Sequence, residues 1–479
     1  MSKTRSVAHN TIIQFGGKAV STALGLAAVA LMTRYLGQAK FGWYTTTIAF
    51  LQFIGIMVDF GMTPVTGQML SEPEYDNKKL LKNILGFRLA TSGVAFGLAP
   101  FIVLFFPYPV EVKIAVSFTN ISFLAISMRQ VLTGFYQKKL KMYVHAIGEV
   151  LGRIVLVGGI ATLIYMGTSF LPFMIIVTFA SIVYTSFLFA YAWKQGYGGI
   201  KYDKKIWKDI TIKMWPLAIS IMFNVIYLKG DTVLLSLFRP QSEVGIYGAA
   251  YKVIDVLTES AMMMMGLLLP LLTHAWSRGK MKEFKQRLQK SFDIMMALGT
   301  PLVVGAIILS KPIMLMVAGG KFSESALPLE ILSIAVFGVF LGATFSHTAV
   351  AMNKQKQTLW VYISDAILTL IGYLIFVPKY GMIGAAWMSV FAELYAGFFL
   401  FFTVRKFAEL KLSFKTFGKI IFAATIMGGA IMVLPQWHVL LLVVIGGVIY
   451  ATTLFAIGGI SIKTIKEIIK LKKTEASTS

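Results

Sequence analysis

Cysteine is missing from the 479-residue sequence, which excludes disulfide bonds, thiolate metal sites and cysteine nucleophiles. Charged residues are scarce at 14%, whereas 57% of the residues are hydrophobic. The mean hydropathy is +0.74. Ordinary soluble domains are roughly half apolar and about one quarter charged, so this chain has too few charged residues to cover a water-facing surface. The composition therefore indicates helices that lie in a lipid bilayer.

The common motifs of nucleotide and metal chemistry are also missing. The chain contains no G-x-x-x-x-G-K-[ST] phosphate loop and no H-E-x-x-H zinc motif, and its five histidines are scattered. We therefore predict a protein that is not an enzyme, needs no cofactor and has no metal site. The segments between apolar stretches are too short to form a soluble catalytic domain. This argues against a membrane enzyme of glycan assembly, which is the alternative from another functional class.

Apolar stretches of about 20 residues recur along the chain, and each is long enough to cross a hydrocarbon layer of ~30 Å. The first is too long, and too polar at Gln14 and Lys18, to be a signal-peptide core, so we expect it to remain in the protein. The predicted fold is an all-α integral membrane protein. We place about fourteen transmembrane helices at 11–33, 41–70, 84–106, 112–133, 143–166, 170–192, 213–238, 244–273, 290–309, 326–351, 358–377, 381–403, 415–434 and 438–460.

A faint internal repeat indicates two lobes of six helices. A glycine followed by an aromatic residue precedes the second, eighth and twelfth predicted helices, at Gly42-Trp43, Gly245-Ile246-Tyr247 and Gly381 to Trp387. Each motif alone is explained by close helix packing. The predicted organisation is an N-terminal lobe at 1–192, an amphipathic cytoplasmic linker at 193–212, a C-terminal lobe at 213–403, two further helices at 404–460 and a basic tail at 461–479.

Lysine and arginine are distributed unequally between the two sides of the predicted helices. The formal net charge is +24. Most of the bases fall in the loops on the side that holds both termini, so the positive-inside rule places both termini in the cytoplasm. We interpret these loops as topology signals that contact anionic headgroups, and not as nucleic-acid sites. The amphipathic segments 194–213 and 274–290 and the tail 463–473 are expected to lie on the membrane surface.

Ionisable residues inside the predicted spans are the most informative feature. Each costs about 3 kcal/mol when it faces lipid, so most should face a hydrated interior. Lys18 and Arg88 lie nearest a cytoplasmic end and could extend to the headgroups instead. The set consists of Lys18, Asp59, Arg88, Glu149, Arg153, Lys229, Asp231, Lys252, Asp255, Glu259, Asp365 and Glu393.

The spacing of these residues allows two interpretations. His145, Glu149 and Arg153 follow one another at four-residue intervals and share one face of the fifth helix. Lys252, Asp255 and Glu259 share a face of the eighth. Either each face lines a polar cavity, or Glu149 pairs with Arg153 and Lys252 with Asp255 and the pairs only neutralise one another.

Bases and acids suggest different roles in transport. The candidate substrate-binding residues are the bases Lys18, Arg88, Arg153, Lys229 and Lys252, which would hold phosphate oxygens of an amphiphilic cargo. The candidate ion-coupling residues are Asp255 and Glu259, followed by Asp59, Glu149 and Asp365. Asp255 and Glu259 are one helical turn apart, so one of them could exchange a proton near neutral pH. That carboxylate would then compete with the cargo for Lys252.

Short motifs at both ends of the chain resemble one transporter family. Arg-Tyr-Leu-Gly at 34–37, Phe-Gly-Trp-Tyr at 41–44 and Asp-Phe-Gly at 59–61 are similar to the opening of polysaccharide-transporter flippases. Pro378 to Ala386 resembles the segment before the twelfth helix of the same family. Together with the predicted helices, the likeness covers essentially the whole chain.

The resemblance implies the fold of the multidrug/oligosaccharidyl-lipid/polysaccharide exporter superfamily, with two lobes in a V around a cationic cavity. It implies alternating access, in which a polyprenyl-pyrophosphate-linked saccharide moves to the outer leaflet of the cytoplasmic membrane. Expected partners are the lipid-linked saccharide, membrane lipids, a proton or sodium ion and glycan-assembly enzymes. Lipid II flippases usually carry an arginine-aspartate pair where this chain has Gly37-Gln38-Ala39-Lys40 and therefore rank second. Multidrug antiporters rank third, since the intramembrane bases suit a cationic cargo poorly.

Overall fold

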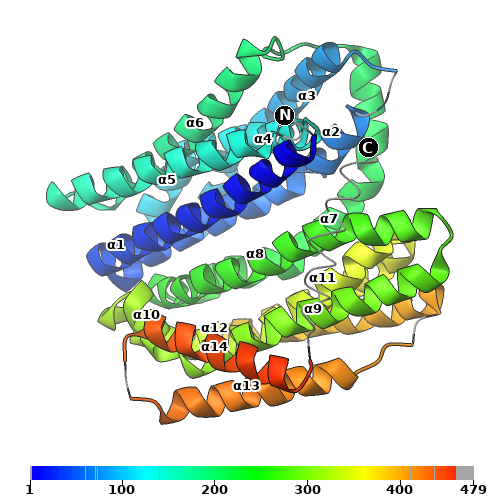
Figure 1. The fold of residues 1–479 in the computed structure, drawn as a ribbon. Helices are drawn as coiled ribbons and strands as arrows, with labels where there is room; N and C mark the ends of the chain where they lie inside the picture. The colour runs from blue at the N-terminus through cyan, green and yellow to red at the C-terminus, as the bar shows by residue number, and fades with distance from the viewer. Residues whose placement is uncertain are drawn as a thin grey trace. The chain divides into compact units, whose positions relative to one another are not determined.

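The computed structural model describes residues 3–59, 61–70, 72, 74–139, 141–409, 411–435 and 437–459. Side chains are described for these residues except 3–12, 15, 57, 64 and 216–228. All regular secondary structure in the described residues is helical (Figure 1). The prediction of an all-α membrane protein is therefore confirmed.

The described chain divides into two compact units, with the boundary between Gly245 and Ile246. In the first unit α7 packs against α1, α2 and α3, and α5 packs between α1 and α6. The lobe boundaries predicted from the sequence stay a prediction. The helices that end before this boundary are α1 (Lys3–Asp59), α2 (Met62–Met69), α3 (Asn77–Ile102), η1 (Val103–Phe105), α4 (Val110–Lys138), α5 (Met142–Tyr165), α6 (Phe170–Lys194) and α7 (Lys204–Phe238).

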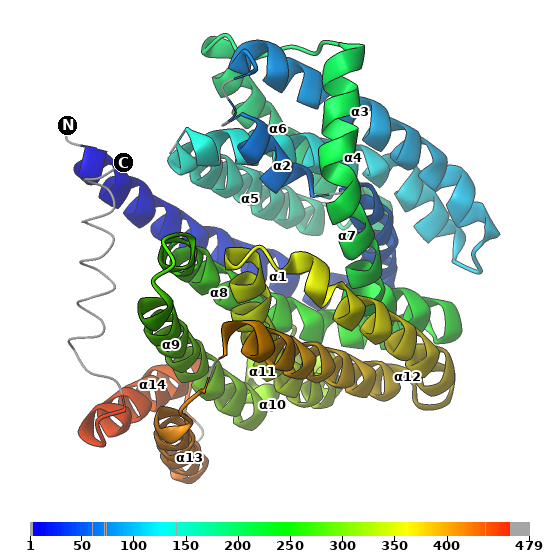
Figure 2. The same ribbon diagram turned by 90° about the vertical axis from the view of Figure 1, so that its right-hand side faces the viewer.

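The second unit is built around α9, α11 and α12. α11 packs along α12 and α9, and α13 and α14 lie side by side against α9 (Figure 2). Its helices are α8 (Gln241–Ser277), which begins just before the boundary, α9 (Met281–Ile308), α10 (Ser310–Val317), η2 (Gly320–Ser325), α11 (Ala326–Ala351), α12 (Gln355–Ala408), α13 (Lys415–Val433) and α14 (Val439–Ala456).

Two of the long helices are each a pair of helices joined at a glycine. Gly37 breaks α1 with φ 70° and ψ −179°, and Gly381 breaks α12 with φ 56° and ψ −135°. Residues with a β-carbon rarely adopt such angles, so glycine permits the chain to turn there without a loop. Eleven helices among the described residues are long and apolar enough to cross a membrane. The two divisions and the 35-residue α7 bring this number to the predicted fourteen.

Large apolar side chains cover much of the described outer surface. On α14, Leu440, Val444 and Val448 are each more than half exposed, and on α5 Ile154 is 53% exposed. Water would penalise so much apolar surface, whereas acyl chains would not. The surface therefore agrees with a multi-pass membrane protein.

Two details of the predicted layout differ in the structure. The span expected at 41–70 is interrupted at Gly61, which has φ 70° and separates α1 from α2. Part of the apolar side of the two amphipathic segments packs into the protein, whereas Ile212 and Met281 are exposed. Ile206 and Ile210 at the start of α7 pack in the core of the first unit, and Phe284 and Leu288 of α9 are fully buried. Segment 463–473 lies outside the described residues.

Candidate functional site

A polar cluster forms where α5 packs between α1 and α6 in the first unit. We call it the α5 cluster, and it consists of Lys18, Ser21, Arg129, His145, Glu149, Arg153 and Tyr184. Gly148 and Gly152 of α5 allow α6 to approach closely. A β-carbon on Gly148 would lie 2.8 Å from the Tyr184 ring. Small residues at these two positions therefore bring Tyr184 onto the polar face of α5.

Glu149 is the acid at the centre of this cluster, and its partners come from α1. Its Oε1 accepts hydrogen bonds from Lys18 Nζ at 3.2 Å and from Ser21 Oγ at 2.8 Å. The Glu149 and Lys18 side chains are 15% and 27% exposed. The alternative pair within α5, Glu149 with Arg153, is not formed. The carboxylate instead links two helices that are far apart in sequence.

Arg153 lies one turn further along α5, and its guanidinium packs against α1. A β-carbon on Gly25 would lie 3.4 Å from the guanidinium carbon, so glycine provides the space for this side chain. Among the described residues Arg153 makes neither a hydrogen bond nor an ion pair. It is half-buried. A base in this setting has all of its hydrogen-bond donors available for an anionic ligand.

Arg129 brings a third base to the cluster from α4. Its guanidinium carbon lies 4.2 Å from the centre of the Tyr184 ring, within the range of a cation–π interaction. It is close enough to Glu149 and Arg153 to interact electrostatically with both. The Tyr184 hydroxyl lies 3.0 Å from His145 Nε2. The α5 cluster therefore combines one lysine and two arginines with one carboxylate, so basic groups outnumber acidic ones.

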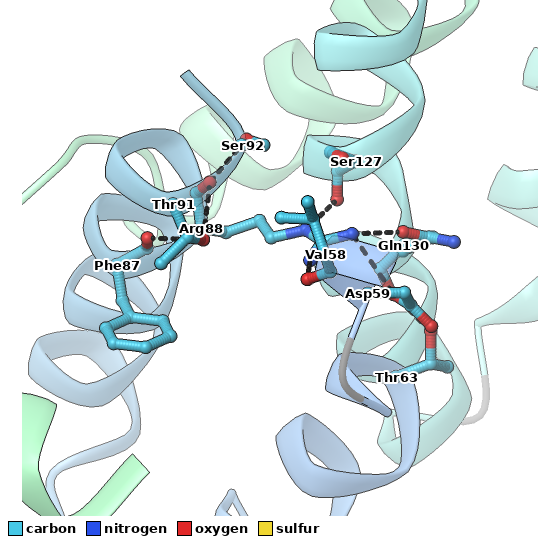
Figure 3. A network of polar contacts seen from close by, with 9 residues as sticks. All are labelled: Val58, Asp59, Thr63, Phe87, Arg88, Thr91, Ser92, Ser127 and Gln130. Carbon is cyan, nitrogen blue, oxygen red and sulfur yellow. Dashed lines mark hydrogen bonds and ion pairs between the residues drawn. The ribbon is translucent and has the colours of Figure 1, made fainter. Parts of the chain in front are cut away.

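Arg88 belongs to a separate network at the end of α1 (Figure 3). Its Nη2 donates to Asp59 Oδ1 at 3.1 Å and to Gln130 Oε1 at 2.7 Å. Its other nitrogens donate to the carbonyl oxygens of Val58 and Ser127. Arg88 is 0% exposed. Because four acceptors of the protein already use its donors, the geometry favours a structural role, and we leave Arg88 and Asp59 out of the proposed cargo site.

Two candidates of the second unit form an ion pair with each other on α8. Lys252 Nζ lies 3.8 Å from Asp255 Oδ2, with the two side chains 25% and 42% exposed. Glu259, one turn further along α8, is exposed. The self-neutralising pair within α8 is therefore present, unlike the one considered for α5.

Asp365 of α12 is the most deeply buried acid of the second unit's candidates. It is 0% exposed, and its Oδ1 accepts a hydrogen bond from Thr369 Oγ1 at 3.0 Å. Its Oδ2 has no hydrogen-bond partner within the described part of the chain. Carboxylate oxygens without a partner are costly in an apolar interior, so this oxygen needs a proton or a cation.

Two further candidates lie together on α7. Asp231 is buried, and its Oδ1 accepts hydrogen bonds from the backbone and the hydroxyl of Thr232. Lys229 lies two residues earlier on the same helix and belongs with it to the first unit.

Sequence analysis missed three members of the α5 cluster, which are Ser21, Arg129 and Tyr184. Arg129 lies inside the predicted span 112–133 but was not among the ionisable residues singled out there. Its position several residues before the end of that span was the available signal. Tyr184 gave no signal, because an aromatic residue in an apolar helix is ordinary core composition. Its role depends on the packing of α6 against the α5 glycines.

Comparison with known proteins shows which family the chain belongs to. A family model for polysaccharide biosynthesis proteins matches residues 7–276, which is more than half of the chain. The chain belongs to the polysaccharide biosynthesis protein family. The resemblance seen in the sequence motifs is therefore confirmed at the level of the family.

Relatives from two organisms match most of the chain. The probable low-salt glycan biosynthesis flippase Agl15 of Haloferax volcanii is 22% identical over 435 residues, covering 88% of this chain and 89% of the relative. A putative O-antigen transporter of Shigella flexneri is 20% identical over 401 residues, covering 80% of this chain and 93% of the relative. The two relatives are thus named as a flippase and a transporter.

Solved structures with the same fold include two kinds of transporter. The lipid II flippase MurJ in an inward closed conformation has a TM-score of 0.74 at 18% identity, covering 92% of this chain and 98% of MurJ. An inward-facing multidrug resistance MATE transporter of the MOP superfamily has a TM-score of 0.66 at 14% identity. The match covers 83% of this chain and 98% of the MATE transporter. At these identities the likeness shows the fold alone. The predicted superfamily fold is confirmed.

Proposed function

We propose that the protein is a flippase that moves a polyprenyl-(pyro)phosphate-linked oligosaccharide from the cytoplasmic to the outer leaflet by ion-coupled alternating access. It would act in the cytoplasmic membrane with both termini inside. Membership of the polysaccharide biosynthesis family and the names of the two relatives support a saccharide cargo. Enzymes that assemble the glycan are the partners that would supply this cargo.

One observation carries the proposal at the level of chemistry. Arg153 has a half-buried guanidinium that makes no hydrogen bond or ion pair among the described residues, beside Lys18 and Arg129 in a membrane-embedded cluster. A base at membrane depth is costly unless it binds an anion. Phosphate oxygens of a lipid carrier match an arginine in both charge and planar geometry. Lys18 and Lys252 stay candidates for the same ligand, in spite of their carboxylate neighbours.

Ion coupling supplies the free energy that net movement to one leaflet requires. The sequence contains no ATP-binding motif, so a gradient of protons or sodium ions is the proposed source. Asp365 supports this part of the proposal because its Oδ2 lacks a partner in the described residues. Asp255 and Glu259 are the second choice, since both lie on a more exposed face of α8.

A second cargo deserves a direct comparison because the solved structure of MurJ is named as a lipid II flippase. Lipid II carries the same pyrophosphate group, so the α5 cluster does not discriminate between the two cargoes. A multidrug cargo is the third possibility, raised by the MATE structure. The excess of basic groups in the α5 cluster disfavours organic cations.

The proposal is tested with purified protein in liposomes. A polyprenyl-pyrophosphate oligosaccharide carries a fluorophore on its sugar, and a membrane-impermeant reductant reports how fast the sugar reaches the outer leaflet. We expect the protein to accelerate this exposure well above that in empty liposomes. Parallel liposomes contain labelled lipid II or are given a fluorescent organic cation. Acceleration for lipid II alone would favour the second cargo, and uptake of the cation alone would contradict the proposal.

A further inference from the structure

The turn between α6 and α7 forms a glycine-rich corner on the side with the basic loops. Gly196 and Gly199 have positive φ values of 78° and 110°. Gly198 packs directly against Trp193, since a β-carbon there would lie 2.5 Å from the indole ring. The backbone N–H groups of Gly198 and Gly199 donate to no acceptor within the described residues. Consecutive unpaired N–H groups in such a turn are donors for an anion.

Three lysines from two other helices surround this turn. Lys139 at the end of α4 donates to the Tyr197 hydroxyl at 3.0 Å, and its Nζ lies 5.0 Å from the ring centre. Lys78 at the start of α3 lies 5.9 Å from the same ring. The methylene chain of Lys82 packs against Gly199. We call these three lysines and the turn at 196–199 the Tyr197 corner.

The lysines of the Tyr197 corner differ from their neighbours in having no acidic partner among the described residues. Lys79 forms an ion pair with Asp203 at 2.6 Å, and Lys213 forms one with Glu72. Lys78, Lys82 and Lys139 form no ion pair in this part of the structure. Topology signalling requires bases on one side of the membrane but does not require them to converge on one aromatic ring. Their convergence without a carboxylate therefore calls for an anion.

An apolar groove begins next to the same corner. It lies along one side of α6 with α4 as a wall, has a volume of about 440 Å³ and is lined by Met128, Thr185, Ser186, Phe189, Ala190 and Trp193. Thr185 donates its hydroxyl hydrogen to the carbonyl of Ala125 on α4. Trp193 connects the two features, because its indole lines the groove and also touches Gly198 of the corner.

We propose that this place binds an anionic phospholipid of the leaflet next to the basic loops. The phosphate group lies at the Tyr197 corner, where three ammonium groups and the free N–H groups of Gly198 and Gly199 surround it. An acyl chain lies in the α4–α6 groove. The cationic corner and the membrane-facing apolar groove adjoin each other, as the charged headgroup and the acyl chain of one lipid molecule do. The site is separate from the α5 cluster and does not depend on which cargo the protein moves.

Lipid binding is tested with the full chain in nanodiscs of phosphatidylcholine that contain a small fraction of phosphatidylglycerol. Native mass spectrometry after release counts the phosphatidylglycerol molecules that stay bound. We expect Lys78→Gln with Lys139→Gln to weaken this retention roughly tenfold or more. The matched control is Lys204→Gln with Lys205→Gln, which removes the same charge from exposed lysines of the neighbouring α7. The control should retain phosphatidylglycerol as the wild type does.

Two further experiments distinguish binding of a lipid from binding of free phosphate. Ala190→Trp fills the groove and should weaken retention, whereas millimolar inorganic phosphate should not displace the lipid. Equal losses in the test and control pairs would overturn the proposal, because they would show a general effect of charge. Full displacement by inorganic phosphate together with an unaffected Ala190→Trp variant would overturn the lipid assignment. Lys82→Gln alone is the second variant, with an expected partial loss, in case the double variant does not fold.

Discussion

The guanidinium carbon of Arg129 on α4 lies 4.2 Å from the centre of the Tyr184 ring on α6. The ring therefore holds in place a base that donates no hydrogen bond to a carboxylate of the described residues. A cation–π contact at a desolvated site contributes about 2 kcal/mol, which is enough to fix one side-chain conformation. Tyr184 also contacts His145 through its hydroxyl, so its two functions can be separated by mutation.

We expect Tyr184→Phe to transport nearly as well as the wild type and Tyr184→Leu to lose most of its activity. Phenylalanine keeps the ring below Arg129 and removes only the hydroxyl near His145. Leucine removes the ring and frees Arg129 to take other conformations. The measurement is the initial rate of sugar exposure in liposomes, at equal protein content. Equal loss in the two variants would assign the importance to the hydroxyl instead.

Arg153→Ala should lower the transport rate about ten- to hundredfold, since a charge-assisted hydrogen bond contributes about 1.5–3 kcal/mol. Arg153→Lys should restore part of it, because lysine keeps the charge but not the planar donor geometry. Thermal unfolding in detergent should change little, because the guanidinium has no hydrogen bond or ion pair among the described residues.

The control for Arg153 is Lys311→Ala, which removes an exposed base from α10 and should leave the rate unchanged. If Arg153→Ala transports normally while remaining folded, the α5 cluster is not the cargo site.

The fold was predictable to a large extent because membrane helices depend on one physical requirement. Every backbone group in lipid must be satisfied within its own helix, so runs of apolar residues report the spans directly. The glycine at position 381 was also visible, as the start of a predicted helix. The interruption at Gly61 was not predicted, although Asp59 before it and Pro64 after it are signals that a helix can end there.

The site was less predictable because pairing between helices depends on packing. The four-residue spacing made Arg153 an obvious partner for Glu149, and sequence spacing cannot show that α1 brings Lys18 closer. Arg88 looked like a cargo ligand because the sequence shows its charge but not its four acceptors. Charge at membrane depth therefore pointed to residues of both polar networks but did not show which of them are internally paired.

Arg88→Met should destabilise the protein by about 3–5 kcal/mol, because it leaves Asp59 and Gln130 without their buried partner. Thermal unfolding in detergent should show this as a lower midpoint. The double variant Arg88→Met with Asp59→Asn should recover part of the loss, since the unpaired charge is removed as well. A normal midpoint for Arg88→Met would contradict the structural role.

The absence of native cysteine makes the orientation directly testable with single added cysteines. Tyr202→Cys, in the turn between α6 and α7, should react in sealed cells only with reagents that cross the membrane. Pro109→Cys, before α4, and Gln241→Cys, at the start of α8, should react with an impermeant reagent from outside. Labelling of the residue 202 variant from outside would contradict the proposed orientation.

Asp365→Asn should abolish the stimulation of transport by an imposed ion gradient while leaving slow exchange between the leaflets. The carboxylate is fully buried, and its Oδ2 has no partner among the described residues. A proton or a sodium ion would complete this group, whereas asparagine supplies its own N–H donors and carries no charge that a cation could neutralise. Asparagine should therefore fix the protein in a state that resembles the occupied one.

The experiment compares wild type, Asp365→Asn, Asp255→Asn and Glu259→Gln in liposomes with a pH gradient or a sodium gradient. Glu324→Gln is the control, because Glu324 is an exposed acid of η2. We expect the control to respond as the wild type does, and the gradient that stimulates it identifies the ion. Because Asp255 is already close to Lys252, its replacement should alter the rate without removing the response. Gradient stimulation that survives in Asp365→Asn but not in Asp255→Asn or Glu259→Gln would move the coupling site to α8.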